Sequence, residues 1–376
     1  MMELNCLCDI YSGYAFKSFN DTSDGIPVIK IGNILSDGTI ELTDCVYTEE
    51  VPKEKYYSKK DDIYIALSGA TTGKIGVMQT DGLYVINQRV GIIRNKGKIP
   101  NDYLKYFLVS KSNQILKEAS GCAQPNISPK QISKYDISIQ TEEKMLLITQ
   151  QLKKIEVILQ NYRNQIDLLD ELVKARFVEM FGDIISNDKN WNSKPLKELC
   201  DISRGASPRP ISDYLGGTIP WIKIGDATIG DSIYINSTKE HIIKEGVRKS
   251  RFIKKGSLIF ANCGVSLGFC RIINFDGCIH DGWLAFQNID TSLNKIFLLT
   301  TINQMTGYFR KIAPGGTQPN LNTDIVGNYI QVVPPLELQN QFADFVKEVD
   351  KSRLEVQKSL KKTQELFDSL MQKYFG

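Results

Sequence analysis

Side chains able to do covalent chemistry are scarce in this chain and form no catalytic pattern. Only two histidines occur, His241 and His280, so a Ser-His-Asp or Cys-His arrangement has little support. The Asn-Pro-Pro or Asp-Pro-Pro string of an amino-methyltransferase is missing from the 376 residues. None of the eight cysteines shows the Cys-x-x-Cys spacing of a zinc site. We therefore expect a protein that is not an enzyme and that holds no metal and no cofactor.

One glycine-rich segment has the composition of a phosphate-binding loop but not its spacing. One residue too few separates Gly69 from Gly73, and Lys74 is not followed by Ser or Thr. The corresponding segment, Gly264 to Gly268, lacks the lysine. We interpret both glycine pairs as tight turns between strands, where glycine tolerates unusual backbone angles.

Positive charge is gathered in two runs, although the chain as a whole is nearly balanced. It has 46 Lys and Arg against 43 Asp and Glu, a net charge of +3, which is not the signature of a strongly basic, histone-like binder. Such a run can be a solvated face, but recurrence at corresponding places favours contact with phosphates. The runs are Lys53, Lys55, Lys59 and Lys60, and Lys244, Arg248, Lys249, Arg251, Lys254 and Lys255.

Polar residues of the types that read base edges lie in loops between the predicted strands. They differ between the two halves of the chain while the apolar framework matches, which indicates two similar domains that read different sequences. Ordinary drift of loops after a duplication is the alternative. We predict DNA contacts for Lys30, Asn33, Ser68, Thr71, Thr72, Lys74, Asn87, Gln88 and Arg89, and for Arg204, Arg209, Lys223, Asn262, Ser266, Arg271 and His280.

The elements that position these residues occur twice. The string Leu-Cys-Asp-Ile of residues 7–10 returns at 199–202, and Ile-Pro-x-Ile-Lys-Ile-Gly of 26–32 returns at 219–225. Gln-Pro-Asn of 124–126 returns at 318–320, and this identity indicates a shared structural role, with a DNA-backbone contact as second choice. Two like units in one chain tend to lie about a pseudo-two-fold axis, and duplex DNA has matching symmetry.

Each half begins as short strands and loops. Segments rich in Ile, Val and Tyr predict strands, and helices are expected from Asp102 to Glu118 and from Asn294 to Lys311. We place the two β-rich domains at residues 1–140 and 194–335, joined through a polar linker at 183–193. The fold class is therefore α+β.

After each domain the spacing of apolar residues changes to a repeat of seven. Apolar residues spaced by seven form two interlocked rows in the segments 141–182 and 336–376, which is typical of a coiled-coil seam. We expect two long helices that pair antiparallel, the alternative being that each folds back on its own domain. Arg353 and Thr363 interrupt the second seam. The predicted seam residues are Leu152, Ile155, Leu159, Tyr162, Ile166, Leu169, Val349, Val356, Leu360 and Phe367.

This arrangement resembles the specificity subunit of a type I restriction–modification system over essentially the whole chain. The resemblance rests on the LCDI-x-x-G opening, the IP-x-IKIG strand, the GCAQPNIS and GGTQPNLN segments, the PPLELQNQ helix entry and the long helix ending in Phe-Gly. The first copy departs from the pattern with IQTEEK where the second has VVPPLE.

The resemblance implies that each unit is a mixed α/β target-recognition domain with a β-rich core, followed by a spacer helix. It implies a bipartite double-stranded DNA target, two methyltransferase subunits as partners, and restriction subunits that join them for cleavage. It also implies that S-adenosylmethionine and ATP bind to those partners and not to this chain. A modification-only system is an open alternative within the family.

Two other functions remain open. A fused methyltransferase or nuclease is opposed by the missing motifs, and a coiled-coil scaffold without direct DNA readout would bind proteins only. The N-terminal segment lacks the basic region and apolar core of a secretory signal, and no stretch approaches the roughly 18 apolar residues of a membrane span. We therefore expect a cytoplasmic protein with no membrane partner.

Overall fold

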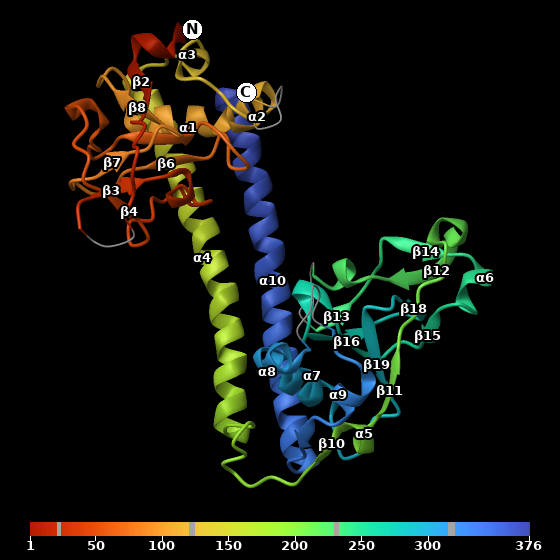
Figure 1. Cartoon of the computed structure of the whole chain (residues 1–376). Helices are drawn as coiled ribbons and strands as arrows, with labels where there is room; N and C mark the ends of the chain where they lie inside the picture. Colours follow the sequence, from red (N-terminus) through yellow and green to blue (C-terminus); the bar gives the residue numbers. More distant parts are fainter. Residues whose placement is uncertain (21–23, 120–124, 229–232, 315–319) are drawn as a thin grey trace. The chain divides into compact units, whose positions relative to one another are not determined.

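The computed structural model describes residues 1–20, 24–119, 125–228, 233–314 and 320–376 (Figure 1). The chain forms two compact units, and each contains one end of both long helices. The first unit comprises Met1–Tyr162 with Ser359–Gly376, and the second comprises Arg163–Lys358. These bounds differ from the segments expected from the sequence, because a compact unit includes whatever covers its core.

The first unit is built on two sheets and a two-stranded ribbon. The main sheet has the order β2-β8-β5-β6, the smaller sheet β4-β3-β7, and the ribbon pairs β1 with β9. The strands are β1 Met2–Glu3, β2 Cys8–Ser12, β3 Ile26–Ile29, β4 Val46–Thr48, β5 Ile63–Ala66, β6 Ile75–Val77, β7 Val85–Ile86, β8 Val90–Asn95 and β9 Asp136–Ile137. The helices are η1 Leu4–Cys6, η2 Ile31–Asn33, η3 Glu54–Tyr56, α1 Asn101–Ser110, α2 Ser112–Ala119, α3 Pro129–Ile132 and α4 Glu142–Phe181.

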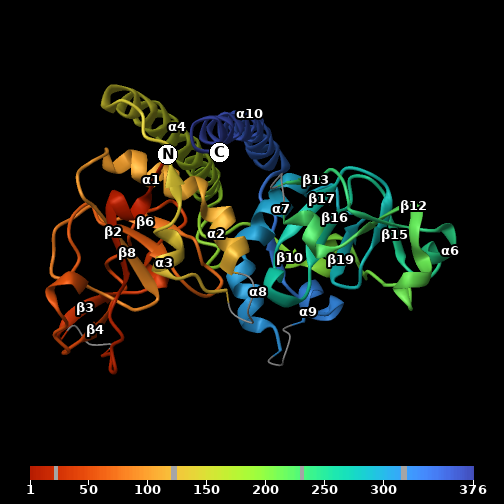
Figure 2. The ribbon, with the colours of Figure 1, turned by 90° about the horizontal axis from the view of Figure 1, so that it is seen from above.

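The main sheet of the first unit is buried on both faces. Ile63 and Ile65 of β5 point to a core shared with Phe107 of α1, which lies over this sheet (Figure 2). Tyr64 and Ala66, alternating with them, face the smaller sheet. Burial on both sides explains why β5 is a continuous apolar run and does not alternate with polar residues.

The second unit repeats this plan with additions. Its main sheet has the order β11-β19-β16-β17-β13, its smaller sheet β14-β12-β18-β15, and its ribbon pairs β10 with β20. The strands are β10 Ser193–Pro195, β11 Asp201–Arg204, β12 Leu215–Ile222, β13 Tyr234–Ile235, β14 Glu240–Ile242, β15 Arg251–Ile253, β16 Leu258–Ala261, β17 Cys270–Ile273, β18 Gly277–Ile279, β19 Trp283–Gln287 and β20 Ile330–Val332. The helices are α5 Leu196–Leu199, η4 Ile211–Tyr214, η5 Ile224–Ala227, α6 Lys244–Val247, η6 Gly264–Ser266, α7 Lys295–Gln304, α8 Thr306–Ile312, α9 Thr323–Gly327 and α10 Leu336–Phe375.

The glycine pairs that suggested a phosphate loop form tight turns in both units. Gly69 and Gly73 both have φ of +85°, and Gly264 and Gly268 have φ of +71° and +99°. The Gly73 amide donates to the carbonyl of Ala66 at 2.9 Å, and the Gly268 amide donates to that of Ala261 at the same distance. The prediction of matching turns between strands is confirmed.

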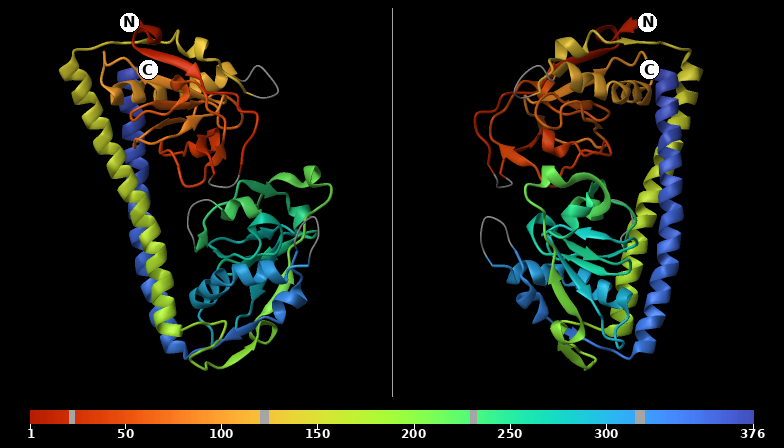
Figure 3. Two further views of the ribbon diagram at one scale, coloured as in Figure 1. Left: turned by 60° about the vertical axis from the view of Figure 1, so that its left-hand side comes forward. Right: turned by 90° about the vertical axis from the view of Figure 1, so that its right-hand side faces the viewer.

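Two long helices complete the cores of both units. In the first unit Leu152 of α4 packs with Met371 and Phe375 of α10. In the second unit Phe177 and Phe181 of α4 pack with Phe342 of α10. The start of each helix thus lies beside the end of the other, and the predicted antiparallel pairing is confirmed (Figure 3).

The buried arginine of the seam is paired. Arg353 is 6% exposed, lies 3.0 Å from the Asp350 carboxylate on its own helix, and forms an ion pair with Asp170 of α4. A buried ion pair adds little net stability, but a mispaired partner is costly because it leaves a charge without compensation. This cluster therefore favours one register of α4 against α10 within the second unit.

Two leucines of α4 test how much the pairing contributes to stability. Leu152 is fully buried and Leu168 is 61% exposed. Leu152→Ala should lower the free energy of unfolding by about 2–5 kcal/mol, because it leaves a cavity in the first unit's core. The matched control, Leu168→Ala, should change it by less than about 0.5 kcal/mol. Chemical denaturation measures both, and equal losses would contradict the described seam.

Candidate nucleic-acid interface

The predicted DNA-contacting residues of the first unit gather mainly at one end of its main sheet. Strands β5 and β8 are antiparallel, with Ala66 opposite Val90 and Ile63 opposite Ile93. The loop that follows β5, residues 67–74, and the turn that precedes β8, residues 87–89, therefore lie at the same end. The Leu67 amide donates to the carbonyl of Arg89 at 2.9 Å, which ties the loop to the turn.

The turn before β8 is held by Asn87, which is only 9% exposed. Its side-chain oxygen accepts the amide hydrogen of Arg89 at 3.1 Å, and its own carbonyl accepts from Val90 at 2.9 Å. Gln88 and Arg89 are exposed beside it. The structure brings these three predicted residues together but gives them different surroundings.

The turn also explains a glycine of the LCDI-x-x-G motif. A Cβ atom on Gly13 would lie 2.2 Å from the carbonyl oxygen of Ile86, and one on Gly205 would lie 2.1 Å from that of His280. The chain following the first strand of each main sheet thus passes against the backbone of the turn. Only glycine permits this approach.

The side chains of the loop after β5 are less exposed than expected for residues that contact DNA bases. Thr72 is 6% exposed, and its hydroxyl donates to the Gly69 carbonyl at 2.7 Å. The hydroxyl oxygen of Thr71 is enclosed without a hydrogen-bond partner among the described residues. Ser68 and Lys74 are half-buried. DNA contact by these four residues stays a prediction.

The repeated Gln-Pro-Asn segments pack against these loops. Asn126 forms a backbone bridge with Ser68 in the first unit, and Asn320 forms one with Cys263 in the second. Gln124, Gln318 and Pro319 lie outside the described residues. For the two asparagines, the backbone pairing agrees with the shared structural role that the sequence indicated.

Lys30 and Asn33 differ in their freedom to contact DNA. The Lys30 ammonium lies 3.9 Å from the ring centroid of Phe19, which is 39% exposed and was not singled out in the sequence. Asn33 is 7% exposed, accepts the Lys30 amide at 2.8 Å, and donates to the carbonyls of Glu41 and Asp44. Asn33 thus shapes the chain after β3.

The second unit has a denser polar cluster at the corresponding turn, residues 280–282. Its centre is Asp281, a residue of a type that can read base edges and the neighbour of the predicted contact His280. The Asp281 carboxylate accepts from the Ser207 hydroxyl at 2.9 Å and lies 3.5 Å from the Arg209 guanidinium, while its backbone carbonyl accepts from Arg204 Nε at 3.1 Å. The structure thus joins His280 to Arg204 and Arg209, which lie far from it in the sequence.

Lys223, the counterpart of Lys30, borders this cluster. Its ammonium forms an ion pair with Glu240 and lies 5.0 Å from the Trp221 ring centroid. The same Trp221 ring lies 5.7 Å from the His280 ring. The Glu240 carboxylate therefore already offsets part of the charge of Lys223, which leaves this lysine less available to bind a phosphate.

The other predicted residues of the second unit have mainly structural contacts. Asn262 is fully buried, and its amide nitrogen lies 3.3 Å from both the Asn320 side-chain oxygen and the Leu321 carbonyl. Arg271 is half-buried, donates to the Cys270 carbonyl and lies 4.9 Å from the Phe269 ring. Ser266 is half-buried and ends the short helix η6.

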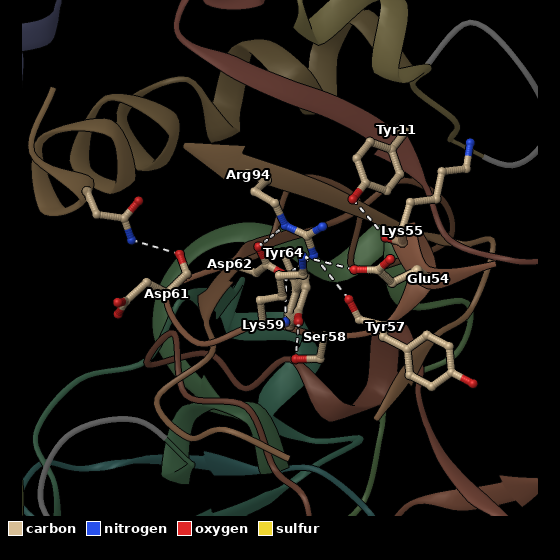
Figure 4. A network of polar contacts seen from close by, with 11 residues as sticks. Tyr11, Glu54, Lys55, Tyr57, Ser58, Lys59, Asp61, Asp62, Tyr64 and Arg94 are labelled. Atoms are coloured by element: carbon tan, nitrogen blue, oxygen red, sulfur yellow. Dashed lines mark hydrogen bonds and ion pairs between the residues drawn. The ribbon is translucent and has the colours of Figure 1, made fainter. Parts of the chain in front are cut away.

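One lysine of the first run, Lys59, is bound through its backbone to a polar network around Arg94 (Figure 4). Arg94 donates to both Asp62 carboxylate oxygens, at 2.7 and 2.6 Å, and to the Tyr57 carbonyl at 3.1 Å. The Lys59 amide donates to Asp62 at 2.8 Å. The side-chain hydrogen bonds to Asp62 raise the pKa of Arg94. The network could not be read from the sequence, because 32 residues separate its two charged members.

A dilysine turn recurs in both units. Lys59 and Lys60 precede Asp61, which has φ of +68°, and Lys254 and Lys255 precede Gly256, which has φ of +80°. In the first unit this turn leads into β5 and is therefore at the opposite end of that strand from the Asn87 turn. Phosphate contact by these lysines stays a prediction.

His280, one of the two histidines in the second unit, lies in surroundings that disfavour its charged form. Burial lowers the pKa of His280, with Asp281 opposing the shift and Lys223, Arg209 and Arg204 adding to it. The Gly282 amide donates to His280 Nδ1 at 2.9 Å, so the single proton of the neutral ring is on Nε2. Nε2 lies 2.9 Å from an Asp281 carboxylate oxygen, to which it donates.

Within the described residues, no group of three or more His, Cys, Asp or Glu side chains is arranged to hold a metal ion. No helix within those ranges has both the length and the apolar character needed to cross a bilayer.

The model of the type I restriction modification DNA specificity domain matches the chain twice, over residues 1–174 and 188–366. The chain belongs to this family. Each match begins before the first strand of one sequence repeat and extends into the long helix that follows that repeat's sheets. The sequence repeat and the family domain therefore coincide.

Relatives in Methanocaldococcus jannaschii cover the chain to different extents. The MjaIX type I specificity subunit is 25% identical over 46% of this chain and 41% of its own length, so that match spans less than half of the relative. The MjaVIII specificity subunit is 20% identical over 84% of this chain and 80% of its own length. A putative MjaX specificity subunit is 22% identical over 97% and 91%.

Solved structures share the fold. The type I S subunit from M. genitalium matches with a TM-score of 0.58 and 16% identity, covering 100% of this chain and 95% of its own. A chain from a study of assembly and conformational transition in a type I restriction–modification system matches with a TM-score of 0.55 and 17% identity, covering 100% and 96%. These likenesses support the family's architecture of two domains and paired long helices.

The pH dependence of stability tests the neutral state of His280. Its folded-state pKa lies below the ordinary 6.5, so protonation of the unfolded chain destabilises the fold as the pH falls below about 6.5. The unfolding midpoint of wild type should therefore fall faster from pH 7 to pH 5 than that of His280→Asn. Thermal unfolding of both proteins across this range measures the difference. Parallel curves would contradict a neutral ring at this half-buried position.

Proposed function

We propose that this chain is the DNA-recognition subunit of a type I restriction–modification complex, and that each unit reads one half of a bipartite target. The observation that carries the proposal is the family match to both repeats, combined with matching turns that hold different polar side chains. In the first unit the turn exposes Gln88 and Arg89. In the second it gathers Arg204 and Arg209 around Asp281.

Catalysis would then be carried out by other chains of the complex. We propose that two methyltransferase subunits bind this protein and supply catalysis and S-adenosylmethionine, and that restriction subunits join them where the system also cleaves. The chain itself is then neither an enzyme nor a cofactor-binding protein, and it acts in the cytoplasm. Support comes from the family and from the absence of a catalytic pattern in the sequence.

We also propose that the two long helices set the separation of the half-sites. Each has 40 residues, so each is roughly 60 Å long at about 1.5 Å per residue. Apolar rows and the Arg353 ion pairs favour one register, which suits a spacer of fixed length.

The target sequence tests the recognition function directly. The chain is co-expressed with the methyltransferase subunit of its own system, and modified adenines are mapped by modification-sensitive sequencing. We expect one motif with two specific parts and an unspecified gap, and steep loss of binding as salt rises. A complex that forms but binds no DNA sequence preferentially would favour a scaffold without DNA readout.

Substitution of an exposed arginine should affect one half of that motif. Arg89→Ala in the assembled complex should weaken binding to the cognate site by about 1–3 kcal/mol and relax one position. The control Lys134→Ala removes one exposed charge from the loop before β9 and should weaken all sequences slightly and equally. Competition binding with cognate and scrambled duplexes separates the two. An equal loss on every sequence after Arg89→Ala would assign that arginine to phosphate contact.

Lengthening both helices tests the spacer. Seven residues inserted into each helix keep the apolar rows in phase and add roughly 10 Å at about 1.5 Å per residue. That length corresponds to about three base pairs at ~3.4 Å each. The gap in the mapped motif should grow accordingly while both specific parts stay the same. An unchanged gap in a folded, active complex would rule out a spacer role.

A further inference from the structure

The two units build one turn from different side chains. In the first unit the Asn87 side-chain oxygen accepts the Arg89 amide at 3.1 Å, and in the second His280 Nδ1 accepts the Gly282 amide at 2.9 Å. Backbone contacts match as well: the Asn87 and His280 amides donate to the carbonyls of Ile29 and Ile222 at 3.0 and 3.1 Å. An amide and an imidazole therefore do the same structural task at corresponding places.

This task occupies the atoms that base recognition would need. An asparagine that recognises adenine uses its oxygen and its nitrogen together, but the oxygen of Asn87 already accepts from Arg89, and the residue is 9% exposed. In His280, Nδ1 accepts from Gly282 and Nε2 donates to Asp281. Both ring nitrogens of His280 are thus engaged within the chain.

Beside Asn87 and His280 lie side chains that are exposed. Gln88 and Arg89 project from the first turn as exposed side chains. In the second unit the residue corresponding to Arg89 is Gly282, which has no side chain to offer. There Asp281 draws in Arg209 from the loop after β11, and the Arg209 side chain remains 82% exposed. Each turn therefore has an exposed guanidinium beside it, supplied by a different element.

We infer that Asn87 and His280 position the turns and do not read bases, and that reading falls to Gln88 and Arg89 in the first unit and to Arg209 in the second. A guanidinium suits the paired acceptors on the major-groove edge of guanine. The inference rests on the proposed function and refines it. It assigns two of the polar residues predicted from sequence to the scaffold, and it makes Asp281 the residue that orients Arg209.

Variants that keep or remove the acceptor test the positioning role. His280→Asn keeps a side-chain acceptor, as Asn87 does, while His280→Leu removes it. Hydrogen exchange of the peptide containing the Gly282 amide is measured first, on the free protein. We expect exchange near wild type in His280→Asn and at least tenfold faster exchange in His280→Leu. Equal exchange in all three proteins would overturn the positioning role, and this result does not depend on DNA.

The second readout is the modified motif in the co-expressed complex. His280→Asn should give the wild-type motif with modification within about twofold, and His280→Leu should lower modification at least tenfold without a new base preference. Arg209→Ala should relax one position in one half of the motif and leave the other half unchanged. A changed base preference in His280→Asn would show that His280 reads DNA. If wild type itself directs no motif, the proposed function fails, whereas the exchange result still stands.

Discussion

The fold depends on one constraint, which is that neither long helix can bury its apolar rows alone. Each helix resolves this by placing its first half in one unit and its last half in the other. Leu152 at the start of α4 shares a core with Phe375 at the end of α10, and Phe181 at the end of α4 shares one with Phe342 at the start of α10. The first unit is therefore completed by Ser359–Gly376 from the far end of the sequence, whereas the second unit is the single stretch Arg163–Lys358, whose two ends are halves of the long helices. Arg353 adds directionality, because Asp170, its carboxylate partner on α4, is met in one register.

The two units share the same main-sheet backbone, and they differ in the polar side chains at the turns of that sheet. The strands β5 and β16, the glycine turns after them and the turns before β8 and β19 correspond residue by residue in their backbone hydrogen bonds. The side chains at the turns do not correspond: one unit exposes Gln88 and Arg89, and the other builds a cluster around Asp281. Duplication followed by change at a few exposed positions is how one scaffold can serve two recognition tasks.

Patterns local in sequence were predictable, and contacts between distant residues were not. The sevenfold apolar spacing gave both long helices, and the repeated strings gave the duplicated sheets. The segment Leu83 to Arg94, however, contains Ile and Val on both sides of the Asn87 turn, where the structure divides it between β7 and β8. That break depends on the approach of Gly13 and on a side-chain acceptor, neither of which periodicity reveals. The partners of Asp281 and Asp62 could not be predicted for a similar reason, since they lie 72 to 74 and 32 residues away.

We propose that each unit reads one half-site separately while the shared helices hold it, and an exchange of domains tests this proposal most directly. Residues 1–140 are replaced by the corresponding segment of a family relative, with the residues that pack on α4 and α10 retained, and the modified motif is mapped in the assembled complex. We expect one half of the motif to change while the other half and the gap stay as in wild type. A change in both halves, or in the gap alone, would contradict it.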